Sequence, residues 1–367
     1  MTRDTNLRKE SRISNLQSRI SIKKMTNVKF GFCLPIFASP SARMFRTPGF
    51  ETVDPAAAMR LGKLADDLGY DSLWVADHLM LGRDQAIMEG WTTLAALAGM
   101  TQRARLGIIH YNNALRHPAL TAKMVATLDH ISAGRMIHFV DYGNRPYEYL
   151  AYGLHTDNTR EERIAEMCEG LDVTLALWTS DQPVSHYGRY YVTREAICAP
   201  APVQRPHPPI WIGEAHPDIL AATAKYAQGW NTTPVSLAEL DVRLTALRAA
   251  CSQAGRNFNE LELSLEIQVL IAPDHAALRE KLRAILSHAP AGEEPETGMA
   301  AYLNGATDQL PASMAETWIA GTPDQARARV QAYVAAGIRH FMLWFVDAPD
   351  ESGMRLFADK VSDPFKM

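Results

Sequence analysis

Eight short apolar runs, separated by longer segments in which apolar residues recur at helical spacing, constrain the fold of this chain more than any other feature. Such alternation is typical of strand–helix units around a parallel sheet. The predicted strands are residues 29–35, 72–77, 105–110, 136–140, 209–213, 229–232, 261–271 and 339–345. Eight units in 367 residues favour a closed (β/α)8 barrel, an α/β fold, over an open doubly wound sheet. No strand is followed by GxGxxG, which argues against a dinucleotide-binding Rossmann fold.

The clearest single unit runs from His117 to Gly143. Pro118 suits the first turn of a helix, where a missing N–H is tolerated. Apolar residues then recur at helical spacing and predict the buried face of that helix: Leu120, Met124, Val125, Leu128 and Ile131. A turn at residues 132–134 leads into the strand at 136–140, which we expect to be buried on both faces.

Composition excludes several classes of protein. A net charge of -4 leaves no basic excess to neutralise phosphates, so nucleic acid is not expected as a partner. No apolar run approaches the roughly 20 residues that cross a bilayer, so we expect no membrane association and a cytoplasmic location. The four cysteines lie far apart with no CxxC pair, so no metal site is predicted.

The chain is predicted to form a single domain over residues 25–367, preceded by a flexible, polar and basic extension at residues 1–24. Three connections, 142–160, 178–207 and 289–317, are too long for plain strand–helix turns. Such insertion segments are usually lids, binding loops or disordered, and the third could be partly helical. Three aromatic residues could favour a planar or apolar substrate, or could equally be packing residues: Phe37, Tyr147 and Trp344.

Polar residues follow the second and third predicted strands. His78 in WVADH lies where the rim of a barrel begins, and a histidine there can move protons near neutral pH. The alternative is a rim histidine that is merely satisfied by hydrogen bonds. After the third strand, His110, Asn112 and Asn113 suggest the floor of a ligand site, or else asparagines that support turns.

The fourth and fifth strands end in charged segments. Asp141 and Tyr142 close the fourth strand, and Arg145 and Arg160 follow as arginines that either bind phosphate or lie solvated at the surface. After PPIWIG, a helix start predicts a phosphate site at its free N–H groups, or a cap formed by Asp218. The residues of this loop are Gly213, Glu214, Ala215, His216 and Asp218.

Together these residues resemble the bacterial luciferase-like superfamily of flavin-dependent oxidoreductases. The similarity runs from about residue 29 to 345 and is strongest in RHPALTAKMVATLDHISAGR, PAPVQRPHPPIWIGEAHPD and AGTPDQARARVQAYVAAGIRHFMLWF. The resemblance implies a (β/α)8 TIM barrel, usually a homodimer, that holds reduced FMN or the deazaflavin F420 at the C-terminal ends of its strands.

The function expected from this resemblance is that of an FMNH2-dependent monooxygenase. Such an enzyme oxidises a small organic substrate with O2 and receives reduced flavin from a separate flavin reductase. The first alternative is an F420-dependent oxidoreductase that transfers hydride without activating O2. The second is a flavin-binding protein without turnover.

The resemblance also assigns residues. His78 matches an active-site histidine, and Tyr142 and Asn112 are expected beside the flavin as further catalytic residues. The expected cofactor-binding residues are Ile109, His110, Asp141, Tyr142, Arg145, Arg160, Gly213, Glu214, Ala215 and His216. The chain departs from luciferase at Ala215 (serine there), Asp218 (threonine), Tyr142 (arginine) and His110 (a small residue).

Overall fold

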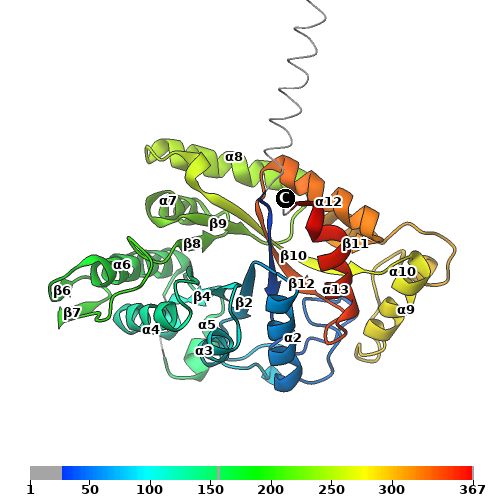
Figure 1. Cartoon of the computed structure of the whole chain (residues 1–367), viewed down its shortest axis with the longest axis horizontal. Helices are drawn as coiled ribbons and strands as arrows, with labels where there is room; N and C mark the ends of the chain where they lie inside the picture. The colour runs from blue at the N-terminus through cyan, green and yellow to red at the C-terminus, as the bar shows by residue number, and fades with distance from the viewer. Residues whose placement is uncertain (1–26, 155–157, 366–367) are drawn as a thin grey trace, which may run out of the picture.

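In the computed structural model, which describes residues 27–154 and 158–365, eight parallel strands close into a barrel (Figure 1). The strands are β1 (Lys29–Cys33), β2 (Ser72–Ala76), β3 (Arg105–Ile109), β5 (Met136–Asp141), β8 (Ile210–Gly213), β9 (Gly229–Thr232), β10 (Glu262–Ile271) and β12 (His340–Phe345). Each falls within one of the eight predicted apolar runs or extends it by one residue, so the predicted (β/α)8 barrel is confirmed. The predicted N-terminal extension lies outside the described residues.

The barrel is closed by pairing between its first and last strands. The order around it is β1–β2–β3–β5–β8–β9–β10–β12, and β12 returns to β1 with Lys29 opposite His340. All of these pairings are parallel. The carboxyl ends of the eight strands therefore open on one face of the molecule, which is where enzymes of this fold bind their ligands.

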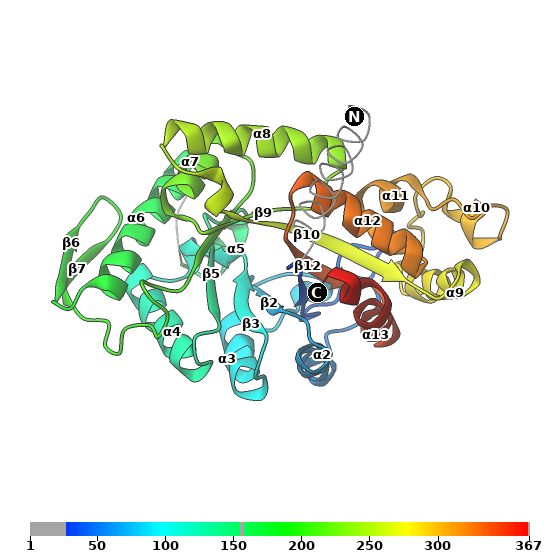
Figure 2. The same ribbon diagram turned by 45° about the horizontal axis from the view of Figure 1, so that its top comes forward.

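One helix follows each barrel strand and covers its outer face (Figure 2). These are α2 (Pro55–Asp67), α3 (Gly90–Met100), α4 (Pro118–Ile131), α6 (Arg160–Thr179), α7 (Pro217–Tyr226), α8 (Leu237–Gln253), α12 (Pro323–Ala336) and α13 (Ser352–Phe357). Alternation of strand and helix around the ring accounts for the regular spacing of apolar runs in the sequence.

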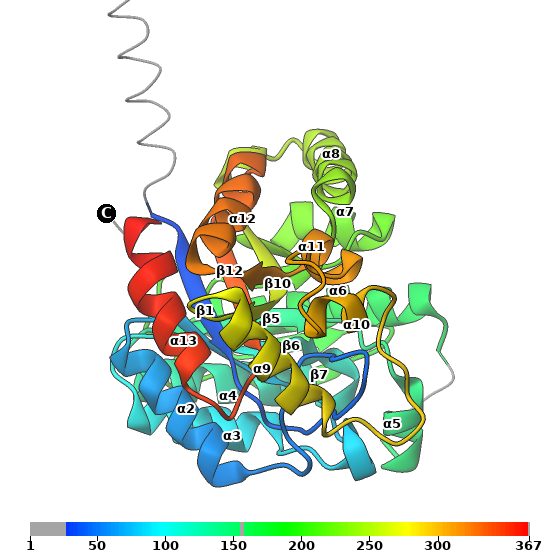
Figure 3. The same cartoon turned by 90° about the vertical axis from the view of Figure 1, so that its right-hand side faces the viewer.

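The three long connections contain short elements of their own. The first holds α5 (Pro146–Ala151) and the second the hairpin of β6 (Val184–Tyr187) and β7 (Val192–Ala196). After β10 come α9 (His275–Leu286), α10 (Met299–Leu303), α11 (Ala312–Thr317) and β11 (Ile319–Gly321), which pairs with the end of β10 beyond the barrel. Figure 3 views this insertion from its own side, with α9 in front of the barrel. The two-residue strand β4 (Tyr111–Asn112) pairs with β5.

Two tryptophans fill the middle of the barrel. The rings of Trp74 from β2 and Trp211 from β8 lie 5.3 Å apart between their centroids. Strand glycines make room for them, because a Cβ atom at Gly107 would lie 2.2 Å from Trp74 and one at Gly229 would lie 2.4 Å from Trp211. Side chains thus occupy this part of the barrel, as in the layered interiors of this fold.

Helix α4 begins at Pro118 as predicted, and its buried face matches the prediction only in part. Val125 and Leu128 are buried as expected, whereas Leu120 and Ile131 are each 55% exposed and Ala122, which was not predicted, is fully buried. The reason is α6, whose Trp178 lies across α4 and donates a hydrogen bond from Nε1 to the Ala122 carbonyl at 2.9 Å. A small residue at the contact lets the two helices approach, so residue size selects the packed face here.

Candidate active site

The strand-end residues predicted from the sequence lie at the carboxyl-terminal mouth of the barrel. His78 follows β2, His110 follows β3, Asp141 ends β5 with Tyr142 after it, and Glu214 follows β8. Two contacts link them: His110 Nδ1 lies 3.4 Å from Asp141 Oδ2, and the Tyr142 hydroxyl donates to Glu214 Oε2 at 3.5 Å. The structure therefore brings residues from three separate strands into one polar cluster.

Arg160 adds a positive charge to this cluster. It is the first residue of α6, whose start is fixed by a capping box in which Thr159 Oγ1 accepts from the Glu162 N–H and Glu162 Oε2 accepts from the Thr159 N–H. Burial raises the pKa of Tyr142 to about 12, and the charge of Arg160 opposes that rise. Burial likewise raises the pKa of Glu214, again against the charge of Arg160. The Arg160 guanidinium thus partly offsets the rise in the pKa of both Tyr142 and Glu214, as a nearby cation does for acidic groups.

His78 is paired with a buried carboxylate. Its Nδ1 lies 3.0 Å from Glu148 Oε1, and the Leu79 N–H donates to Glu148 Oε2 at 3.0 Å. Arg145 contributes a second cation, with Nε 2.9 Å from Glu148 Oε1. Burial alone would raise the pKa of Glu148, but these partners lower it overall, so the group is a carboxylate at neutral pH. A carboxylate facing Nδ1 holds the proton on that nitrogen and leaves Nε2 of His78 as the reactive one.

His110 lies between two carboxylates. Its Nδ1 faces Asp141 and its Nε2 lies 3.4 Å from Oε2 of Glu266, a fully buried residue of β10. Burial opposes protonation of the ring, yet the two carboxylates outweigh it and raise the pKa of His110 to about 9. The peptide bond between Ile109 and His110 is cis.

The loop after β8 differs from a simple phosphate cradle. His216 caps α7, because its Nδ1 accepts from the Asp218 N–H at 3.4 Å, so Asp218 is not the helix cap. Glu214 has a φ of 83° and its carbonyl accepts from Trp230 Nε1 at 2.9 Å. A carboxylate at the loop and another on the first turn of α7 weaken this helix start as a site for a phosphate dianion.

Asn112 makes local contacts. Its N–H donates to Asp77 Oδ2 at 3.0 Å, and its own Oδ1 accepts from the Ala114 N–H at 3.0 Å. Asn113 donates through Nδ2 to the Tyr191 hydroxyl at 2.9 Å. Both side chains are buried, so the structure places them beneath the surface of the mouth.

The three aromatic residues considered for the substrate site have different surroundings. Phe37 and Trp344 are each 1% exposed, and their ring centroids lie 5.9 Å apart in an edge-on arrangement. Tyr147 is 44% exposed on α5. Phe37 and Trp344 are therefore packing residues, and only Tyr147 is open to a ligand.

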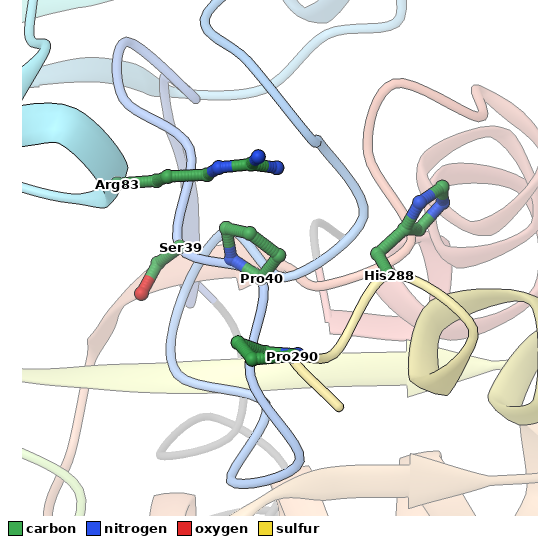
Figure 4. Close-up of a pocket in the computed structure, with 5 residues that line it drawn as sticks. All are labelled: Ser39, Pro40, Arg83, His288 and Pro290. Carbon is green, nitrogen blue, oxygen red and sulfur yellow. The ribbon is translucent and has the colours of Figure 1, made fainter. Parts of the chain in front are cut away.

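A pocket of about 440 Å³ opens on the rim, on the side of the loops after β1 and β2. Figure 4 shows Arg83 and His288 on two sides of it, with two prolines between them. Five residues line this pocket: Ser39, Pro40, Arg83, His288 and Pro290. It is an open surface that carries the cationic side chain of Arg83, and it is formed by the segments that follow β1, β2 and α9.

Sequence reasoning missed Glu266 and its partner Arg46. Glu266 Oε1 lies 2.6 Å from Arg46 Nη2 and accepts from Trp344 Nε1 at 2.6 Å. The usable signal was an acidic residue inside the apolar run LSLEIQVLI, because a fully buried charge requires partners. Its partners lie on distant parts of the chain, so the run itself does not identify them.

Within residues 27–154 and 158–365, no group of three or more histidine, cysteine or acidic residues has the arrangement of a metal site. Over the same ranges, no helix combines the length and apolarity needed to cross a bilayer.

Comparison with known proteins places the chain in a family. The family model described as luciferase-like monooxygenase matches residues 28–340. An F420-dependent glucose-6-phosphate dehydrogenase of Microbacterium testaceum is 28% identical over 324 residues, covering 85% of this chain and 94% of the relative. The chain therefore belongs to the luciferase-like monooxygenase family, and it is an oxidoreductase.

Solved structures share the fold. The coenzyme F420-dependent tetrahydromethanopterin reductase of Methanopyrus kandleri has a TM-score of 0.71 at 21% identity, covering 93% of this chain and 100% of its own. The monooxygenase RslO1 of Streptomyces bottropensis has a TM-score of 0.71 at 25% identity, covering 91% of this chain and 98% of its own.

The expectation of an FMNH2-dependent monooxygenase is wrong. Three relatives that match over 94–95% of their length are named F420-dependent glucose-6-phosphate dehydrogenase, which supports the alternative of hydride transfer. The segments that suggested the family belong to the barrel framework, and this framework occurs with either cofactor. They identify the family without deciding between the two reactions.

Proposed function

We propose that the chain is an F420-dependent oxidoreductase that moves a hydride between F420 and a carbon of a small alcohol or carbonyl substrate. The observation that carries the proposal is the match to F420-dependent glucose-6-phosphate dehydrogenases, at 27–28% identity over 85–87% of the chain. The match also covers 94–95% of the length of each of these relatives, so it is a match between whole chains.

The charges at the mouth support F420 over FMN. The helix start after β8, where an FMN phosphate was expected, carries Glu214 and Asp218 and is already capped by His216. Positive charge lies instead around the β5–α6 connection, in Arg160 and in Arg163, whose Nε donates to the Gly143 carbonyl at 3.0 Å. F420 carries several anionic groups on a long side chain, and arginines bind carboxylates and phosphates in paired geometry.

The chain's own residues supply the proton chemistry. F420, when bound, provides a ring carbon that accepts or donates a hydride, and the protein contributes binding and orientation. An alcohol that loses a hydride must also lose its hydroxyl proton. His78 takes that proton at Nε2, since Glu148 holds a proton on Nδ1 and stabilises the imidazolium that forms. In the reverse direction the same imidazolium returns the proton.

A side-by-side binding experiment tests the cofactor. Purified protein is titrated with F420 and, separately, with FMN, and binding is followed by fluorescence of each cofactor. We expect F420 to bind at least tenfold more tightly, a difference of about 1.4 kcal/mol. Equal or tighter binding of FMN contradicts the proposal.

A turnover experiment tests the reaction. Oxidised F420 is mixed with a panel of sugar phosphates and secondary alcohols, and loss of its visible absorbance is recorded with and without O2. Hydride transfer predicts the same rate in both conditions, because O2 takes no part. A rate that requires O2 contradicts the proposal.

The proposed partners follow from this function. They are a small-molecule substrate and F420, and we propose a homodimer as the assembly. Light scattering of the purified protein tests the assembly, with a mass close to twice 40.7 kDa expected. The separate flavin reductase and O2 were expectations tied to the FMNH2 reading, and the F420 reaction requires neither.

A further inference from the structure

The ring of His110 spans the inside of the barrel. The residue follows β3, and Glu266 lies on β10, which is the fourth strand from β3 in either direction around the ring. Its Nε2 faces Glu266 at 3.4 Å and its Nδ1 faces Asp141 at 3.4 Å, while the ring packs on Phe139 with centroids 4.6 Å apart. Two opposite walls of the barrel therefore fix the orientation of one imidazole.

This geometry specifies the charge of the ring. A neutral imidazole has one N–H and one lone pair, whereas an imidazolium has two N–H donors. Because each nitrogen of His110 faces a carboxylate oxygen, a neutral ring would set its lone pair against a negative charge. Only the doubly protonated ring directs an N–H toward each carboxylate, and both contacts are at ion-pair distance.

Glu266 is itself held in place from a third direction. Arg46, on the loop after β1, approaches Oε1 at 2.6 Å, and its backbone N–H donates to Gln268 Oε1 at 2.8 Å. Burial alone would raise the pKa of Glu266, but its cationic partners lower it to about 2. The groups facing His110 are thus Asp141 and Glu266, with Glu214 further away and Arg46 behind Glu266.

We propose that Glu266 is a positioning residue that holds His110 as a fixed imidazolium at the inner end of the mouth. His110 there favours whichever state of a bound cofactor carries more negative charge. The imidazolium itself does not depend on the identity of the cofactor. Its use toward F420 rests on the proposed function. For a deazaflavin ring that gains a hydride and takes up no proton with it, the reduced state is the more negative one.

The experiment uses nuclear magnetic resonance of cofactor-free protein with ¹⁵N-labelled histidine. His110 signals are assigned by their loss in His110→Gln. In wild type both ring nitrogens should remain protonated at pH 8, with a titration midpoint near 9. Glu266→Gln should lower that midpoint by at least one pH unit, because loss of a close opposite charge shifts a pKa by about 1–3 units.

The same strand provides a matched control. Glu262 pairs with the buried His340 at 3.0 Å, four residues before Glu266 and at the other end of the barrel. Glu262→Gln should change the signals of His340 and leave the midpoint of His110 where it is in wild type. A merely structural effect of removing a buried carboxylate would act in both variants.

A second variant gives a shift of opposite sign. Arg46→Gln removes the cation that shares Glu266 with His110, so the midpoint of His110 should rise. A wild-type His110 that is neutral at pH 7 overturns the proposal, as does a midpoint that moves in neither variant. The wild-type titration decides the charge of His110 even if Glu266→Gln fails to fold.

A binding comparison tests the use of this charge. Oxidised and reduced F420 are titrated anaerobically into wild type and His110→Gln. We expect wild type to favour the reduced form, and His110→Gln to lose at least tenfold of that preference. An unchanged ratio overturns the role toward the cofactor. Failure of both forms to bind wild type overturns the proposed function instead, while the imidazolium seen by magnetic resonance stands.

Discussion

His78 Nδ1 and Glu148 Oε1 lie 3.0 Å apart although the two residues are 70 positions apart in the sequence. The contact joins the end of β2 to the short helix α5, which lies in the first long connection. That connection therefore supplies the carboxylate of the pair for which we propose proton transfer.

The first prediction concerns this pair. His78→Gln should lower kcat by about 10²–10⁴-fold, the usual contribution of a positioned acid–base group, with F420 affinity unchanged. Steady-state rates and fluorescence titration check the two parts. His130→Gln is the control, because His130 lies on the exposed outer face of α4 and bonds only to the Ala201 carbonyl. Equal activity of His78→Gln and His130→Gln would remove His78 from the mechanism.

The second prediction concerns the anionic part of the cofactor. Arg160→Gln should weaken F420 binding at least tenfold, because a charge-assisted hydrogen bond contributes about 1.5–3 kcal/mol. Fluorescence titration at fixed ionic strength measures this. The control is Arg189→Gln. The Arg189 side chain is 70% exposed and pairs with Glu162, which lies on α6 like Arg160. If both variants bind F420 alike, the cofactor's anionic groups lie elsewhere.

The third prediction is a pH dependence of stability. The Asp66 carboxylate accepts hydrogen bonds from the backbone N–H groups of Gln102, Arg103 and Ala104 at 2.8–3.0 Å. Burial alone would raise its pKa, but these bonds lower it below the ordinary 3.8. A carboxyl group with a lowered folded-state pKa stabilises the fold above pH 4 and loses that contribution as the pH falls through the folded value.

Asp66→Asn should therefore reduce the free energy of unfolding by about 1–3 kcal/mol at pH 7. The difference from wild type should shrink below pH 4, as measured by urea unfolding at several pH values. The neighbouring Asp67 is the control. Its side chain is 57% exposed and pairs only with Lys63, so Asp67→Asn should change stability by less than about 0.5 kcal/mol. A pH-independent loss in Asp66→Asn would contradict the explanation.

The fourth prediction concerns the packed interior. Gly107→Ala places a methyl group 2.2 Å from the Trp74 ring and should destabilise the protein by about 1–3 kcal/mol through overpacking. Gly99→Ala, on the exposed side of α3 with nothing within 4 Å of the new Cβ, should stabilise by up to about 1 kcal/mol. Thermal unfolding of both variants measures the sign of each change in stability. A stabilised Gly107→Ala variant would contradict the explanation by overpacking.

The strands were predictable because each is buried on both faces and reads as an apolar run between turns. The catalytic rim was partly predictable, because polar residues directly follow those runs, as at His78 and Tyr142. Glu266 was not, since its partners Arg46 and His110 come from other parts of the chain, and only closure of the barrel brings them within 3.4 Å. Contacts across a closed ring leave no local pattern in the sequence.

Helix α4 shows a second limit. The spacing of its large apolar residues correctly predicted that Val125 and Leu128 are buried, but it also placed Leu120 and Ile131 on that face, and it missed the buried Ala122. Hydrophobicity ranks residues by their transfer to an apolar phase, whereas a close helix contact also requires the two backbones to approach. The sequence of α4 alone does not predict where Trp178 of α6 packs against it.

The packed pair of Trp74 and Trp211 limits how this protein can adapt to other substrates. The two indole rings fill the interior of the barrel, and Gly107 and Gly229 make room for them, so a deeper ligand chamber would require changes on four strands at once: β2, β3, β8 and β9. Substrate selectivity must therefore be set by the loops and insertions that follow the carboxyl ends of the strands. These segments can change in length or composition while the packed interior of the barrel keeps the protein folded.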